Sequence, residues 1–120
     1  MNLIHVTISV SDLEQSLRFY NELVGLPIKR RFASPGTEIV FLGDGGADIE
    51  LIHHENNGAL SIGKDISIGF AVESVEAKLA ELRAAGVEAT NIISPNPHVR
   101  FFFVSDPSGV RIQFVESLGA

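Results

Sequence analysis

The residues most able to do chemistry stand in two short segments that the chain repeats in its second half. Residues 4–10 (IHVTISV) are echoed by residues 66–72 (ISIGFAV), and residues 48–51 (DIEL) are echoed by residues 111–114 (RIQF). At the matched polar positions the first copy has His5 and Glu50, and the second copy has Ser67 and Gln113. An imidazole and a carboxylate can bind a divalent metal or transfer a proton, so the first copy carries the stronger functional groups.

Side chains that share the strand faces of these groups are candidate ligand contacts. In residues 4–10 small polar residues alternate with apolar ones, and the polar residues fall on the same side of the strand as His5. Residues 101–103 are all phenylalanine, and successive strand side chains point to opposite faces, so core packing explains one face only. We expect five side chains to contact a ligand: Thr7, Ser9, Ser67, Phe101 and Phe103.

Each candidate also has a simpler explanation. A single strand histidine on a polar face is more often hydrogen-bonded within the protein than bound to a metal, and Glu50 could face solvent. His53 and His54 are neighbours, so on a strand they would point to opposite faces, which disfavours a metal clip. The basic run 29–31 (KRR) could meet an anionic part of a ligand, but a solvated strand edge explains it more simply.

The spacing of apolar residues indicates which elements hold these groups. Residues 4–10 alternate as in a half-buried strand, and the segment from Ser11 to Gly25 has a capping box, helical spacing and a left-handed stop. About 62 positions later the same pattern returns, with Ser74 as the helix cap and Gly86 as the stop. Each half therefore begins with a strand and a helix.

Shorter β-like runs separated by tight turns follow each predicted helix. They cover residues 38–42, 48–52, 101–104 and 110–115, and one further strand precedes each pair, at 27–32 and 88–93. Each half reads βαβββ, which predicts an α+β fold of tandem modules: module one at about 1–55, a linker at about 56–64 and module two at about 65–120. One helix covers only one face of such a sheet, so the uncovered faces would form a cup that holds the polar residues.

This arrangement resembles the vicinal oxygen chelate superfamily, which includes glyoxalase I, bleomycin-resistance proteins and extradiol dioxygenases. The resemblance covers essentially the whole chain. It rests on the tandem repeat, the strand histidine, the helix that contains residues 16–20 (SLRFY) and the turn at 106–109 (DPSG) before the last strand. The chain looks most like the small bacterial lactoylglutathione lyases, and the resemblance implies a cupped mixed sheet with helices on its outer face.

The resemblance also implies roles for individual residues. In this family the first and last strands of each module hold a divalent metal, which places His5, Glu50 and Gln113 at ligand positions for Ni²⁺, Zn²⁺ or Mn²⁺. Ser67 stands where the family usually has histidine, and Gln113 where glyoxalase I has glutamate. These departures predict a weaker metal site. They leave Glu50 as the catalytic base for an enediolate-type step on a small metabolite, without full glyoxalase activity.

Metal-free binding is the alternative function. The bleomycin-resistance branch implies a cup that sequesters a small molecule without any cofactor, and the acidic charge and eight Phe residues suit a cationic aromatic ligand. A regulatory or scaffolding domain has no positive support in the sequence. A dioxygenase-type ferrous site would need two histidines and a carboxylate, and therefore fits less well.

Composition limits the partners and the cellular setting. A net charge of −6 argues against nucleic acid and anionic membrane surfaces, and no apolar run approaches the roughly 20 residues of a membrane span. The lack of cysteine and of a signal-peptide pattern favours the cytoplasm. In related proteins the first module of one chain pairs with the second module of another, so the resemblance implies a homodimer with shared cups.

Overall fold

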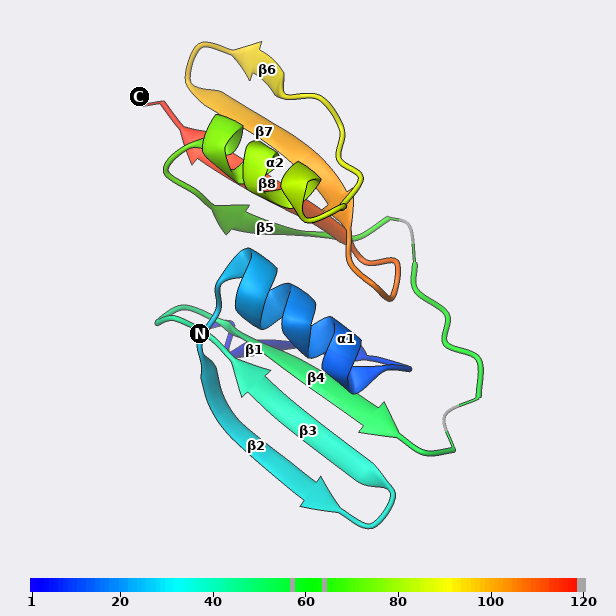
Figure 1. The fold of residues 1–120 in the computed structure, drawn as a ribbon. Coiled ribbons are helices and arrows are strands. Elements are labelled where there is room, and N and C mark those ends of the chain that lie inside the picture. Colours follow the sequence, from blue (N-terminus) through cyan, green and yellow to red (C-terminus); the bar gives the residue numbers. More distant parts are fainter. Residues whose placement is uncertain (57, 64, 119–120) are drawn as a thin grey trace. The chain divides into compact units, whose positions relative to one another are not determined.

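The computed structural model describes residues 1–56, 58–63 and 65–118, and it divides into two compact units, Met1–Ser61 and Ile62–Ala120. Positions 57 and 64 of the predicted linker and positions 119–120 of the predicted second module lie outside the described residues. The first unit contains β1 (His5–Ser9), α1 (Leu13–Arg18), η1 (Phe19–Val24), β2 (Ile28–Ser34), β3 (Thr37–Leu42) and β4 (Asp48–His54) (Figure 1). The second contains β5 (Ser67–Ala71), α2 (Val75–Ala84), β6 (Ile93–Asn96), β7 (Val99–Ser105) and β8 (Arg111–Ser117).

Each unit holds one four-stranded mixed sheet, with the order β1-β4-β3-β2 in the first and β5-β8-β7-β6 in the second. The first strand of each unit runs parallel to the last, and the other pairs are antiparallel. This register sets Thr7 opposite Glu50 in one sheet and Gly69 opposite Gln113 in the other. The α+β class and the tandem βαβββ order predicted from the sequence are confirmed.

In the first unit, α1 packs against β4 and covers one face of the sheet (Figure 1). Apolar residues from the strands and the helix form the buried core between them: Ile8, Val10, Leu13, Leu17, Tyr20, Val40, Leu42, Ile49 and Leu51. Because strand side chains alternate, the residues between these positions, among them Thr7 and Glu50, lie on the face that the helix leaves uncovered.

The N-cap of the first helix lies one residue later than predicted. Asp12, and not Ser11, is the N-cap: its backbone is extended, and its Oδ1 accepts the N–H of Gln15 at 3.0 Å. The helix then widens into the π-helical segment η1, where the N–H of Gly25 bonds to the carbonyl of Tyr20. Gly25 has φ 93° and ends the helix as predicted.

The second helix is held at both ends by the residues that the sequence predicts. The Oγ of Ser74 accepts the N–H of Ala77 at 3.1 Å. Gly86 has φ 82°, and the N–H of Val87 bonds to the carbonyl of Leu82 at 3.0 Å, which completes a Schellman motif. None of the helices in the described parts of the chain is long and apolar enough to cross a bilayer.

The predicted strand over residues 88–93 is wrong. β6 starts only at Ile93, and within the predicted range the described backbone makes one isolated bridge, at Ala89. Next to this bridge the N–H of Thr90 bonds to the carbonyl of Phe103 at 3.0 Å, while the N–H of Phe103 bonds to the Thr90 hydroxyl at 2.9 Å. A side chain thus replaces a backbone acceptor, and the ladder is interrupted.

A buried carboxylate joins α2 to the strands beneath it. Glu116 accepts the N–H of Val75 at 2.8 Å and a guanidinium N–H of Arg100 at 3.0 Å. Arg100 also donates to Glu76 at 2.6 Å. The hydrogen bond from Val75, and then the one from Arg100, lower the pKa of Glu116 below its ordinary value of 4.5.

Glu116→Gln should therefore destabilise the protein at neutral pH. A carboxylate whose pKa is depressed by folding stabilises the folded state above its unfolded pKa and loses this contribution as pH falls through the folded pKa. In urea unfolding, the midpoint difference between Glu116→Gln and the parent chain should be largest near about pH 7 and shrink below about pH 4. Glu76→Gln, which removes the exposed partner of Arg100, should have a smaller effect. A Glu116→Gln difference that does not change with pH would contradict this account.

The turn that leads into β4 brings backbone close to a buried acid. A Cβ built on Gly43 would lie 2.1 Å from the Oδ1 of Asp48. Asp48 accepts hydrogen bonds from the Nζ of Lys29 at 3.1 and 3.2 Å, so its carboxylate cannot move away without losing this partner. Only a glycine fits here without displacement.

Gly43→Ala should lower the free energy of unfolding by about 1–3 kcal/mol, the usual cost of forcing extra volume into a packed site. Gly46→Ala is the matched control, because no atom lies within 4 Å of a Cβ built there and its φ is not positive. Thermal or urea unfolding of both variants measures the difference. Equal losses at the two positions would show that the contact with Asp48 is not the cause.

Candidate functional site

His5 and Glu50 converge on the open face of the first sheet. They lie on the neighbouring parallel strands β1 and β4, and the Nε2 of His5 is 3.6 Å from the Oε1 of Glu50. The His5 side chain is 37% exposed and the Glu50 side chain 14%, so the imidazole is accessible while the carboxylate is largely covered. The structure thus brings together the two strongest groups that the repeat singled out.

Thr7 fixes one oxygen of this pair. Its hydroxyl donates to the Oε1 of Glu50 at 2.5 Å, the same oxygen that faces His5. A hydrogen bond of this kind restricts the rotamers of the carboxylate and orients it toward its neighbour. Ser9, the other predicted contact on this strand, is half-buried opposite Ile52, one alternation further along.

An aromatic residue and an arginine extend the same row across the sheet. The ladder places Phe41 of β3 opposite Glu50, and Arg30 of β2 opposite Phe41. The ring of Phe41 meets His5 edge-on with centroids 5.8 Å apart, and the guanidinium carbon of Arg30 lies 4.4 Å from the Phe41 centroid. These four residues, Thr7, Glu50, Phe41 and Arg30, form one row across the sheet, from a hydroxyl through a carboxylate and an aromatic ring to a cation.

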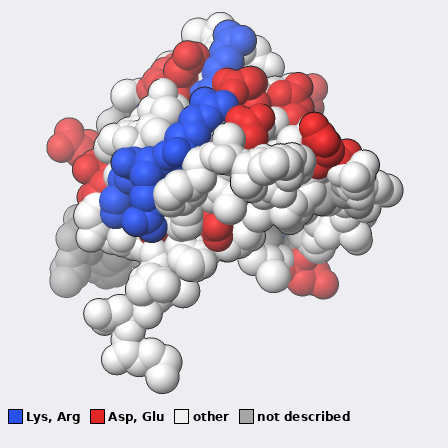
Figure 2. Space-filling model, turned by 90° about the horizontal axis from the view of Figure 1, so that it is seen from below, with Lys and Arg blue, Asp and Glu red and all other residues white. Residues whose placement is uncertain are grey.

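The neighbours of Arg30 in the basic run have carboxylate partners. Lys29 pairs with Asp48, and Arg31 pairs with Glu14 and Glu38. All seven residues of β2 are exposed, and β2 is an edge strand, as the simpler interpretation of this run predicted. Figure 2 shows Lys and Arg side chains gathered in a band on the face that it displays, with Asp and Glu side chains beside part of it.

The second unit repeats this row with weaker groups. Gln113 of β8 lies opposite Gly69 and Phe103, and the guanidinium carbon of Arg111 lies 4.0 Å from the Phe103 centroid. Phe103 also meets Phe101 edge-on, with centroids 5.6 Å apart. The two rings share one face of β7, as predicted. Ser67 is exposed at the start of β5, opposite Arg111.

The two rows differ in how the central polar residue is held. In the second unit a Cβ built on Gly69 would lie 3.5 Å from the Oε1 of Gln113, so the amide rests against a strand that has no side chain at this point. In the first unit Thr7 occupies the matching place and bonds to Glu50. The carboxylate is thus anchored by a hydroxyl that the amide lacks.

Sequence reasoning found the polar members of the first row and missed its other end. Phe41 and Arg30 were not predicted as site residues. A signal for Phe41 was present, since it precedes Phe103 by the same offset that separates Ile4 from Ile66. Arg30 belongs to the basic run 29–31, but the sequence does not show which residue of that run faces the row, because a register shift between Ile28 and Arg30 changes which residues of β2 share a face.

The first row fits part of a divalent metal site. Two ligands at about 2.0–2.2 Å from one ion stand roughly 3 Å apart, close to the 3.6 Å between the Nε2 of His5 and the Oε1 of Glu50. Within the described ranges, His, Cys, Asp and Glu side chains form no group of three or more that could hold a metal ion. The pair therefore suits two coordination positions of such a site.

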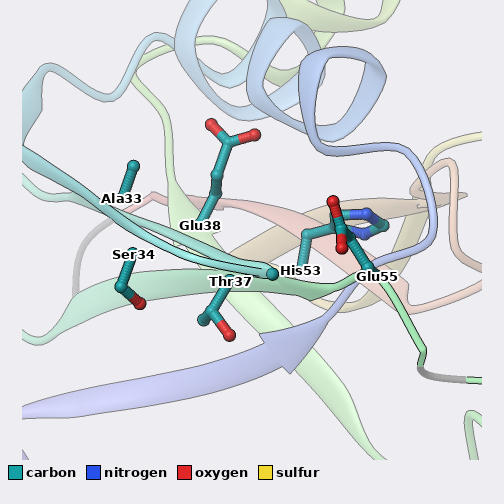
Figure 3. Close-up of a pocket in the computed structure, with 7 residues that line it drawn as sticks. Ala33, Ser34, Thr37, Glu38, His53 and Glu55 are labelled. Carbon is teal, nitrogen blue, oxygen red and sulfur yellow. The ribbon is translucent and has the colours of Figure 1, made fainter.

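A shallow hollow of about 220 Å³ lies at the β2–β3 hairpin, away from this row (Figure 3). It is lined by Ala33, Ser34, Gly36, Thr37, Glu38, His53 and Glu55. His53 and His54 belong to β4, which extends two residues beyond the predicted run 48–52. The Nδ1 of His53 contacts the carbonyl oxygen of Val10 at 2.9 Å, and the Nδ1 of His54 contacts the hydroxyl of Thr37 at 3.0 Å. Both histidines have partners within the protein, which agrees with the simpler interpretation of this pair.

These features define a class: a tandem α+β protein with a histidine–carboxylate pair on an open sheet face. Residues 2–114 match the Glyoxalase/Bleomycin resistance protein/Dioxygenase superfamily. The chain therefore belongs to this superfamily.

Individual relatives agree with this assignment. The chain is 29% identical over 126 residues to a probable lactoylglutathione lyase of Synechocystis sp., covering 98% of this chain and 96% of the relative. It is 28% identical over 126 residues to the lactoylglutathione lyase of Haemophilus influenzae, covering 98% and 93%. The structure of the trypanothione-dependent glyoxalase I of Leishmania major superposes with a TM-score of 0.84 at 26% identity, over 97% of this chain and 86% of that one.

Proposed function

We propose that this protein is a glyoxalase I-like lyase or isomerase that acts on a small metabolite with the help of a divalent metal. The observation that carries the proposal is the convergence of His5 and Glu50, with their facing atoms 3.6 Å apart on the open side of the first sheet. Gln113 would add a weaker ligand from the second unit. A bound Ni²⁺, Zn²⁺ or Mn²⁺ would stabilise negative charge on a substrate oxygen.

Each residue of the row has a distinct task in this proposal. His5 would hold the metal. Glu50 removes a proton from the carbon next to a substrate carbonyl and returns it to the adjacent carbon, as general base and then general acid. Thr7 occupies Oε1 of Glu50, so among the described residues Oε2 has no competing partner for this proton. Gln113 cannot accept a proton, and one carboxylate must therefore carry out both transfers.

Two variants test the metal and the base separately. Protein purified without chelator or affinity tag should retain a near-stoichiometric metal, and His5→Ala should lose it while His54→Ala, which removes a histidine bonded to Thr37, should keep it.

Glu50→Gln should abolish conversion of the hemithioacetal of methylglyoxal and glutathione, or lower it by at least about 10²-fold, the usual contribution of a general base. A parent chain that stays metal-free after refolding with Ni²⁺, Zn²⁺ and Mn²⁺ would overturn the proposal.

A metal-free binding protein is the second candidate. The observation that favours it is that the first unit offers two strong donors and that the matching positions of the second unit are Ser67 and Gln113. In this case Ser67 and Gln113 would serve as hydrogen-bonding wall residues. A planar cation, the ligand type expected from composition, would meet like charge at Phe41 and Phe103, because an arginine already lies on each ring. Tight binding of a ligand by metal-stripped protein would favour this function over the first.

We also propose that the working unit is a homodimer in which each site combines the first unit of one chain with the second unit of its partner. β1 and β5 lie at the edges of their sheets, and Ile4 and Ile66, which precede them, are 69% and 71% exposed. Exposed edges with apolar residues favour pairing with another chain. Sedimentation at micromolar concentration should give the mass of two chains, and Ile4→Glu should shift it toward one. A monomeric parent chain would contradict this proposal.

A further inference from the structure

Arg30 differs from most basic residues in the part of the chain that the structure describes, because its guanidinium has no carboxylate partner. Carboxylate partners exist for Arg18, Lys29, Arg31, Lys78 and Arg100. The contacts of Arg30 are with two aromatic rings, Phe41 at 4.4 Å and Phe32 at 5.8 Å from the guanidinium carbon. In a chain of net charge −6, a cation without a carboxylate partner is a candidate for binding an anionic ligand.

The sheet register places this cation in line with the candidate site. Glu50, Phe41 and Arg30 are consecutive partners across β4, β3 and β2. Neighbouring strands are about 4.8 Å apart, so the backbones of Glu50 and Arg30 are separated by about 10 Å. A small metabolite can span this distance. One end of it would meet His5 and Glu50, and the other would reach the guanidinium.

The aromatic contact prepares the guanidinium for an anion. Stacking on Phe41 restricts the long side chain of Arg30, so less rotamer entropy is lost when a ligand binds. The N–H groups at the edge of a stacked guanidinium remain available for two parallel hydrogen bonds to a carboxylate or phosphoryl group. A cationic ligand would be repelled at the same place.

The second unit has built the same arrangement by a different route. Arg111 lies 4.0 Å from the centroid of Phe103, and it comes from the last strand of its unit, whereas Arg30 comes from the edge strand. Arg111 also has no carboxylate partner among the described residues. In both units, therefore, an arginine stacks on the phenylalanine of the row, although the two arginines do not occupy matching positions of the repeat. This recurrence points to a requirement for positive charge on these faces.

We infer that Arg30 is a specificity-determining residue that binds an oxyanion, a carboxylate or a phosphoryl group, on the ligand held by His5 and Glu50. The inference rests on the proposed function only because both place the ligand on the same face of the first sheet. It assigns a charge to the ligand, and it holds whether that ligand is converted or merely bound.

The test compares three probes of similar size and different charge: benzoate, phenyl phosphate and neutral benzamide. Binding is followed by NMR titration at low salt, with the resonances of His5 and Phe41 as reporters. The parent chain should bind at least one of the anionic probes more tightly than benzamide, and Arg30→Gln should weaken anion binding about tenfold, as expected for loss of one charge-assisted contact. Preference for benzoate or for phenyl phosphate identifies the anionic group.

Arg18→Gln is the matched control, because it makes the same change in net charge at an exposed helix position that pairs with Glu22. It should keep anion affinity within about twofold, and urea unfolding should show that both variants are folded. Equal affinity for benzamide and the anions, no binding of any probe by the parent chain, or equal losses in the two variants would overturn the inference. Metal content, measured in parallel, separates this result from the proposed function, since Arg30→Gln should retain metal as the parent chain does.

Discussion

Parallel pairing between the first and last strands of each unit is the constraint on which the rest of the structure depends. Parallel strands cannot be joined by a hairpin, so the chain leaves β1 through the helix, reaches β2 at the far edge of the sheet and returns through β3 to β4. The helix covers one sheet face only. The same pairing sets β1 directly beside β4 and fixes their register. The convergence of His5 and Glu50 follows from that register, and both residues lie on the face opposite the one that α1 covers.

The internal repeat makes the second unit a comparison within one molecule. The backbone register is the same at Thr7–Glu50 and at Gly69–Gln113, yet the functional groups differ. A hydroxyl next to a carboxylate can hold it in one orientation, whereas a glycine next to an amide cannot. The chemical difference between the units therefore lies in side chains placed on an unchanged scaffold, which is how a single fold serves several activities.

Most of the fold could be predicted from the sequence because alternation, caps and stops are local signals. Errors arose where two different groups could satisfy the same local hydrogen-bonding requirement. Ser11 and Asp12 can both cap a helix, and the hydroxyl of Thr90 replaces a backbone acceptor without any mark in the hydrophobic pattern. The repeat revealed His5 and Glu50, and the structure brings them together. The basic run 29–31 was considered as a contact for an anionic ligand, but the sequence could not single out Arg30 within it, because the place of Arg30 opposite Phe41 depends on a register shift in β2.

The position of β1 at the edge of its sheet has a thermodynamic consequence. An edge strand leaves one row of backbone N–H and C=O groups available to another chain. In β1 these groups belong to the same five-residue segment that contains His5 and Thr7. Any chain that pairs along β1 would order the backbone that presents the imidazole. Association and ligand binding would then share free energy reciprocally, so that a ligand on this face tightens assembly by the same factor by which assembly tightens the ligand.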